Sequence, residues 1–224
     1  MASPTLLALD PVEVAELAEV SRSFEGRPAS SVIRWAVERF HPNLCLTASM
    51  NDAVLIDLAV KVEPSIEVVF IDTGHHFPET LDTLELVRSR YGLNLTVVGA
   101  DEGTAPLGPD GCCSGSKVTL LEEGLAGHQA WMSGLRRAEA PTRAQAPIVG
   151  VDLRGLVKLN PIATWTDDDV AGYIADNDIP VNPLLSRGYP SVGCQPCTFP
   201  VAEGADPRSG RWAGSERTEC GLHV

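Results

Sequence analysis

The sequence predicts an α/β fold in which a mostly parallel sheet carries helices on both faces. Short apolar segments alternate with segments that have helical periodicity, in the order strand, helix, strand, helix, strand. This order is typical of parallel crossover connections. At 224 residues with 44% hydrophobic content, the chain is long enough to bury one full core.

Two helices are expected before the first strand. Residues 10–13 combine a capping aspartate, a proline in the first turn and an acid three residues after the cap, a pattern that favours a helix start. A second helix is expected at about 29–40, with Ile33, Val37 and Phe40 facing inward. These helices precede the segment in which the sheet is predicted.

The sheet is predicted to begin at residue 44. Strands are expected at 44–48, 66–71, 95–98 and 131–135, and a hairpin-like pair at 148–151 and 156–159. Helices are expected at 53–59, 78–91, 118–123 and 166–177, the last with Thr166 and Asp169 as a capping pair. Cys45 lies in the middle of the first strand among apolar neighbours, so we expect an inert core residue.

Two turns are expected to face one cleft. In a parallel sheet, ligands bind beyond the carboxyl ends of the strands. Residues 49–52 and 72–74 follow the first two strands, so Ser49, Asp72, Thr73 and Gly74 are candidates for substrate binding. A helix N-terminus after Ser49 offers unpaired N–H groups and a positive dipole end, which suits a phosphate. Neither a G-x-G-x-x-G nor a G-x-x-x-x-G-K-[ST] motif occurs, so dinucleotide and P-loop interpretations lack support.

The charge and the hydropathy of the chain exclude several classes of partner. The net charge is −13, which repels polyanions and makes nucleic acid a poor candidate. No apolar run approaches the roughly 18 residues of a membrane span, and the N-terminus lacks the pattern of a signal peptide. We therefore expect a cytoplasmic protein without a membrane partner.

A small anionic substrate remains compatible with this charge if cations gather locally. Two regions rich in glycine and cysteine carry such cations, 117–143 and 208–217. A solvated surface is the alternative explanation for scattered arginines. The cations are Lys117, Arg136, Arg137, Arg143, Arg208, Arg211 and Arg217.

The six cysteines are too few for a disulfide-stapled secreted scaffold. Cys112-Cys113 and the Cys194-x-x-Cys197 pair supply four thiolates, which favours a metal centre that ties the irregular segment 186–200 to the loop at 112. A four-cysteine zinc site usually separates its paired ligands by two to four residues, so the adjacent pair favours iron–sulfur over zinc. A redox dithiol is the third possibility, and it is weakened because Cys194 follows a glycine in a loop.

Cys220 lies five residues from the end of the printed chain, where little fold remains for it to stabilise. Thiolate chemistry requires access, and a cysteine on a mobile tail has it. The alternative is a disordered terminus that happens to contain a cysteine.

These segments together carry a resemblance that extends from about residue 44 to the end. The chain resembles the assimilatory sulfonucleotide reductases, and within them the iron–sulfur-containing adenylyl-sulfate (APS) reductases. The segments that carry the resemblance are Ile71–Thr80, Cys112-Cys113, Gly134–Arg137, Lys158–Pro161, Gly188–Thr198, Arg208–Trp212 and Glu219–His223.

The resemblance implies an adenine nucleotide alpha-hydrolase-like fold and thioredoxin-dependent reduction of APS to sulfite and AMP, with an S-sulfonated cysteine as intermediate. It implies N-terminal helices at 1–40, a nucleotide-binding region at 41–185, and a cluster-bound segment with a mobile catalytic tail at 186–224. Cys220 would be the nucleophile. A [4Fe-4S] cluster would be bound by Cys112, Cys113, Cys194 and Cys197, and substrate contacts would include Lys117, Arg136, Arg208, Arg211 and His223.

One position departs from the family pattern, and three alternatives remain open. The family commonly has an arginine–lysine pair after the double cysteine, whereas this chain has Ser116-Lys117. A reductase of 3'-phosphoadenylyl sulfate (PAPS) would generally lack the cysteine couplets. A non-catalytic iron–sulfur or zinc module that senses redox state would not need Cys220. A nucleotide-transferring pyrophosphatase would need a glycine-rich loop where residues 49–52 stand.

Overall fold

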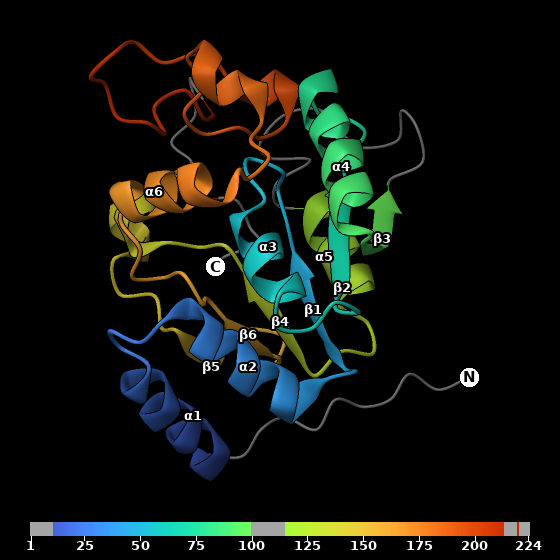
Figure 1. Ribbon diagram of the computed structural model, residues 1–224, viewed down its shortest axis with the longest axis vertical. Helices are drawn as coiled ribbons and strands as arrows, with labels where there is room; N and C mark the ends of the chain where they lie inside the picture. Colours follow the sequence, from blue (N-terminus) through green and yellow to red (C-terminus); the bar gives the residue numbers. More distant parts are fainter. Residues whose placement is uncertain (1–10, 100–114, 213–218, 220–224) are drawn as a thin grey trace.

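The computed structural model describes residues 11–99, 115–212 and 219, and its centre is a six-stranded sheet of order β3-β2-β1-β4-β6-β5 (Figure 1). Every strand pairing is parallel except that of β5 with β6, which is antiparallel. The predicted mostly parallel sheet and its hairpin-like pair are therefore confirmed. The strands are β1 (Leu44–Thr47), β2 (Glu67–Asp72), β3 (Asn94–Gly99), β4 (Ala130–Ser133), β5 (Val149–Val151) and β6 (Val157–Leu159).

The helices follow the predicted order. The helices predicted at 29–40 and 78–91 begin and end at those residues, and the Thr166–Asp169 capping box is present. None of the described helices combines the length and the apolar character that crossing a bilayer would require. The helices are α1 (Pro11–Ser23), α2 (Ala29–Phe40), α3 (Val54–Val60), α4 (Pro78–Tyr91), α5 (Lys117–Gly124) and α6 (Asp167–Asn177), with 3-10 helices η2 (Arg137–Glu139), η3 (Pro141–Arg143), η4 (Pro183–Arg187) and η5 (Gln195–Cys197).

Two sequence-based details differ in the structure. Strand β4 ends at Ser133, two residues before the predicted end, because its neighbours β1 and β6 end at Thr47 and Leu159 and offer no further ladder partner. In α2, Ile33 is buried as predicted, but Val37 and Phe40 are only half-buried against the core. The other fully buried α2 side chains are Ala29, Val32 and Ala36.

Alternate residues of the central strands pack on opposite faces of the sheet, which explains why helices cover both faces. Leu46 and Phe70 belong to the larger core, which also takes in side chains of α1, α2, α3, α4 and α6. Cys45 and Val69 belong to the smaller core under α5. Cys45 is fully buried, and burial raises the pKa of its thiol to about 12, as expected of an inert core cysteine.

The segment 183–212 crosses the carboxyl edge of the sheet (Figure 1). The backbone N–H of Gln195 donates to the carbonyl of His75 over 2.7 Å. Phe77, Leu184 and Val192 form a small apolar cluster beneath the segment. Apolar packing and backbone hydrogen bonds therefore attach this segment to the sheet, in addition to any tie through the predicted metal centre.

Asn182 ties this segment to the turn after β1. Its side chain is 1% exposed and donates to the carbonyl of Met50 and the hydroxyl of Thr80, each over 3.1 Å. Its amide oxygen accepts from the N–H of Leu184 over 3.0 Å. One buried amide thus joins β1, α4 and η4.

Replacing Asn182 by alanine should lower the free energy of unfolding by about 2–4 kcal/mol, because it leaves buried backbone groups of Met50 and Leu184 without partners. Urea unfolding measures the change. The control is Asn94→Ala, which removes one exposed hydrogen bond to the Ser65 carbonyl and should cost less than about 1 kcal/mol. Equal costs for the two variants would contradict the role given to Asn182.

Candidate active site at the carboxyl edge of the sheet

A cavity of about 730 Å³ lies at the carboxyl ends of β1, β2 and β4. Its volume falls in the range of small-molecule sites. The turn at 49–52 and the residues after β4 form part of its wall, segments 190–193 and 206–212 contribute from the C-terminal region, and α3, α5 and α6 also line it. The predicted cleft beyond the strand ends is therefore present.

Most of the cations singled out in the sequence line this cavity, although the chain as a whole is acidic. They come from α5, from the segment that follows β4, and from the C-terminal segment, so residues far apart in sequence meet here. A scattered solvated surface does not describe them. The lining cations are Lys117, Arg136, Arg137, Arg143, Arg208 and Arg211, whereas Arg217 lies outside the described residues.

Arg136 and Arg137 leave the end of β4 in different directions. Arg136 donates to the carboxylate of Asp167 over 2.7 Å and lies 3.8 Å from that of Glu139. Arg137 pairs with Glu25 over 2.6 Å and donates to the carbonyl of Ala146. Arg137 therefore braces the N-terminal helices against the sheet.

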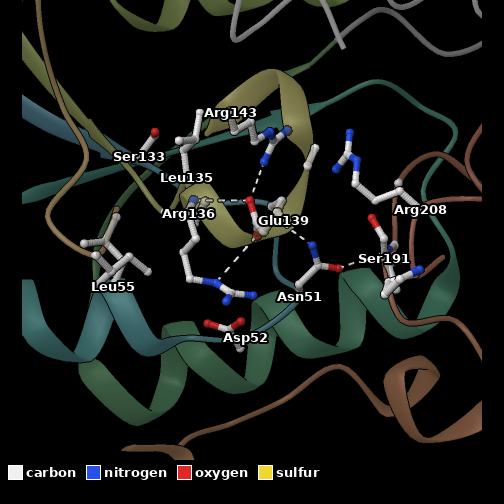
Figure 2. A pocket seen from close by; sticks show the side chains of 18 of the residues that line it. Asn51, Asp52, Leu55, Ser133, Leu135, Arg136, Glu139, Arg143, Ser191 and Arg208 are labelled. Atoms are coloured by element: carbon white, nitrogen blue, oxygen red, sulfur yellow. Dashed lines mark hydrogen bonds and ion pairs between the residues drawn. The ribbon is translucent and has the colours of Figure 1, made fainter. Parts of the chain in front are cut away.

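Arg143 on η3 is the most completely paired of these cations. Its Nε and Nη2 donate to the two carboxylate oxygens of Glu219 over 2.8 and 2.7 Å. Its Nη1 donates to Glu139, and Figure 2 shows Glu139 between Arg136 and Arg143. Although burial opposes the charged form of Arg143, the pairs with Glu219 and Glu139 raise its pKa.

Glu219 also contacts the opposite wall of the cavity. Arg208 donates to its carboxylate over 3.1 Å, and the Thr142 hydroxyl donates over 2.8 Å. Burial lowers the pKa of Arg208, and the nearby Arg143 cation adds to this effect. For Glu219, burial acts in the opposite direction, yet hydrogen bonds from Arg143 and Thr142 lower its pKa.

Arg211 is held in place by the backbone around it. It donates to the Ser191 hydroxyl and the Val192 carbonyl over 3.2 and 3.3 Å, and its guanidinium lies 4.6 Å from the ring centroid of Trp212. A side chain at Gly193 would overlap the guanidinium, so only glycine permits this packing. The C-terminal segment thus presents a fixed cation to the cavity.

Lys117 is the cation at the start of α5, and it is half-buried at the cavity wall. Within the described ranges it forms no ion pair with an acid.

The turn after β1 lines the cavity through Ser49, Asn51 and Asp52, but it differs from the expected phosphate site. Helix α3 begins at Val54, and the Asp52 carboxylate accepts its backbone N–H over 3.0 Å. Burial raises the pKa of Asp52, although the hydrogen bond from the Val54 N–H and the charge of Arg136 partly oppose this rise. The chain's own Asp52 carboxylate thus lies at the helix start where the sequence analysis expected a phosphate to fit.

The second predicted turn, residues 72–74, lies next to the cavity but does not line it. Asp72, Thr73 and Gly74 are not among the residues that line the cavity. The Asp72 carboxylate accepts the Gly74 N–H over 2.8 Å, and the buried Thr73 hydroxyl lies 3.3 Å from the Cys194 sulfur. His76 lines the cavity instead.

Cys194 directly precedes the 3-10 turn η5 and Cys197 is its last residue, and both are buried, 6% exposed. The Cys197 carbonyl accepts the Trp212 N–H over 2.9 Å, so this turn is joined directly to the segment that carries Arg208 and Arg211. Cys112, Cys113, Cys220 and His223 lie outside the described residues. Within the residues that are described, no three potential metal ligands lie together.

The mostly parallel sheet, with a cation-lined cavity beyond its strand ends, has the fold of the adenine nucleotide alpha-hydrolase-like class, which the solved structures below share. The sequence profile of the family described as Phosphoadenosine phosphosulfate reductase domain matches residues 42–200. The chain belongs to this family.

Curated relatives match most of the chain. It is 48% identical to the adenosine 5'-phosphosulfate reductase of Streptomyces coelicolor, over 94% of this chain and 95% of the relative. It is 47% identical to the protein of the same name from Mycolicibacterium smegmatis, over 94% of this chain and 91% of that protein. The family resemblance inferred from the sequence motifs is confirmed.

Solved structures agree on the fold. The phosphoadenylyl-sulfate (PAPS) reductase of Candida auris, in a phosphate complex, has a TM-score of 0.67 at 26% identity, with 84% of this chain and 97% of that chain covered. The FMN adenylyltransferase of Candida glabrata has a TM-score of 0.59 at 15% identity, with 94% and 88% covered. The second likeness concerns the fold alone.

Several residues of the cavity were missed by the motif analysis. Asn51 lies within a turn that was singled out, so it had a local signal, whereas Arg143 was named among the cations but its pairing was not predicted. For Glu139, the only sequence signal was its position between two arginine-containing segments. The pairing of Glu219 with Arg143 joins residues 76 positions apart, and no local pattern reveals it.

Proposed function

We propose that this chain reduces adenylyl sulfate to sulfite and AMP in assimilatory sulfate reduction, with thioredoxin as the electron donor and the cytoplasm as its location. The observation that carries the proposal is that Glu219, the neighbour of Cys220 in the chain, pairs with Arg143 and Arg208, two of the cations that line the cavity. The names of relatives that span most of the chain support it.

In the first step, the Cys220 thiolate attacks the sulfur of the phosphosulfate. A sulfur–sulfur bond forms, the bond from sulfur to the phosphate oxygen breaks, and AMP leaves with the electron pair. Because the AMP phosphate is a weak base, its departure needs little help from a general acid. The step needs cations that offset the repulsion between two anions, and Lys117, Arg208, Arg211 and His223 would supply them.

In the second step, a thiolate of reduced thioredoxin attacks the Cys220 sulfur. Sulfite leaves, a mixed disulfide forms, and the second thioredoxin thiol displaces Cys220. The two electrons that reduce the substrate sulfur therefore come from the thioredoxin dithiol, which ends as a disulfide. The two steps together require that Cys220 face the substrate first and a second protein afterwards.

A [4Fe-4S] cluster would be held by Cys112, Cys113, Cys194 and Cys197. Cys194 and Cys197 are the two of these four residues that the structure describes, and they fit such a cluster. Both thiols are buried, and the Thr73 hydroxyl lies against the Cys194 sulfur. When bound, the cluster supplies a fixed charge and a crosslink between the two couplets. The chain's own contribution is the backbone link from Cys197 to Trp212, which couples the turn to the substrate cations.

The nucleoside end of the substrate would lie toward the turn after β1. Asp52 disfavours a phosphate there, whereas Ser49 and Asn51 offer a hydroxyl and an amide that suit polar atoms of a ribose or an adenine. The anhydride would then lie toward Lys117 and Arg211. Asp72, Thr73 and Gly74 would support the cysteine turn, with no substrate contact.

PAPS is the alternative substrate, because the family and the Candida auris relative are named for it. The cysteine couplets favour APS. Comparing kcat/KM for the two nucleotides decides between them, since a PAPS reductase would prefer the 3'-phosphorylated substrate.

The adduct on Cys220 is the first prediction of this mechanism. Protein mixed with APS and no reductant should stop after one turnover, release AMP and gain about 80 Da on the peptide that ends the chain. Added thioredoxin should discharge the adduct as sulfite, and Cys220→Ser should prevent it while keeping the iron content. Cys45 is the internal control and should stay unmodified, and an adduct on any other cysteine would contradict the assignment.

The metal centre gives a second prediction. Serine at Cys194 or Cys197 should remove iron, inorganic sulfide and activity together, because each replaces one of four thiolate ligands. Metal and sulfide analysis of anaerobically purified protein measures the loss, with Cys45→Ser as the matched control. Stoichiometric zinc without sulfide in the unmodified protein would rule out the cluster.

The cations give a third prediction. Arg211→Ala should weaken AMP binding by about 1.5–3 kcal/mol, the usual worth of a hydrogen bond to a charged group, with the iron content unchanged. Calorimetric titration measures the affinity. The control is Arg187→Ala, because Arg187 is exposed, pairs with Glu79 and does not line the cavity. Iron loss in Arg211→Ala would instead assign this arginine a structural role.

A further inference from the structure

The carboxylate of Glu219 joins two walls of the cavity that are distant in sequence. One wall is η3, where Thr142 and Arg143 donate to it, and the other is the C-terminal segment, where Arg208 donates to it. The side chains of Arg143 and Glu219 are only 10% and 12% exposed. Solvent therefore screens this ion pair little, and its bidentate geometry fixes direction as well as distance.

The guanidinium of Arg143 is committed to carboxylates of the chain itself. Arg143 uses Nε and Nη2 for Glu219 and Nη1 for Glu139, so two acids neutralise one cation. Such a site has little charge left for a substrate anion. Arg143 therefore differs from Lys117, which has no acid partner among the described residues.

We infer that Glu219 is a positioning residue for the reaction proposed above. Its carboxylate holds residue 219 against Thr142 and Arg143, beside Arg208, and this anchor would limit the positions open to the adjacent Cys220 during the transfer step. The inference rests on the proposed function. Consecutive Cα atoms are about 3.8 Å apart, so fixing Glu219 restricts the range of positions that the Cys220 thiol can reach.

The contrary possibility is that Glu219 occupies the subsite of the substrate anion and must be displaced by it. The two possibilities predict opposite effects. If Glu219 positions the thiol, its removal slows the transfer step and leaves nucleotide affinity nearly unchanged. If Glu219 competes with substrate, its removal tightens nucleotide binding and leaves the transfer step as fast or faster.

The test measures the rate of the first turnover at saturating APS without reductant. The variants are Glu219→Ala, Glu219→Gln and Arg143→Ala. AMP affinity and iron content are measured for the same proteins. Glu219→Ala should slow adduct formation about 10- to 100-fold, the range expected for loss of hydrogen bonds to a charged group. Glu219→Gln keeps part of the hydrogen bonding and should fall between Glu219→Ala and the unmodified protein. AMP affinity should change less than about threefold in both Glu219 variants, because Lys117 and Arg211 remain.

A double variant separates positioning from general damage. If Arg143 acts through Glu219, Arg143→Ala combined with Glu219→Ala should be no slower than the slower single variant, because both changes remove one contact. The matched control is Glu203→Ala, an exposed acid of the same segment that does not line the cavity, and it should react at the unmodified rate.

The outcomes distinguish this inference from the proposed function. If the unmodified protein forms no adduct, the proposed function fails. If it forms the adduct and Glu219→Ala does so at the same rate, or binds AMP more tightly, the positioning role is overturned while the proposed function stands.

Discussion

Charge pairing across the carboxyl edge of the sheet is the interaction on which the rest of the site depends. Several cations meet in one cavity, and their mutual repulsion would oppose folding unless acids lay between them. Glu139 lies between Arg136 and Arg143, and Glu219 lies between Arg143 and Arg208. These acids thus hold Arg136, Arg143 and Arg208 in place, whereas Arg211 is held by Ser191, the Val192 carbonyl and Trp212.

The parallel sheet determines where these charges meet. Because β1, β2 and β4 run in one direction, the turns that follow them all open at one edge. Segment 183–212 crosses that edge and is attached by Asn182 and by the Gln195 backbone. The cysteine turn is hydrogen-bonded to the segment that carries Arg208 and Arg211, so we expect a change at the cysteines to displace Arg211.

Local signals predicted the elements well and long-range pairing poorly. The bounds of α2 and α4 follow from caps and helical periodicity, and both were predicted to the residue. The cap that Asp52 places on α3 was missed, because its side chain can face either the helix or the cavity. The Arg143–Glu219 pair and the packing of Arg211 on Gly193 depend on how distant segments fold together, which no spacing rule contains.

A crystal structure of anaerobically prepared protein with AMP tests the central claim most directly. The account predicts that the AMP phosphate lies within about 3 Å of donors on Lys117 or Arg211, with Glu219 still paired to Arg143. The nucleoside should lie toward Ser49 and Asn51. A phosphate bound at the start of α3, or one that replaces Glu219 on Arg143, would contradict the account.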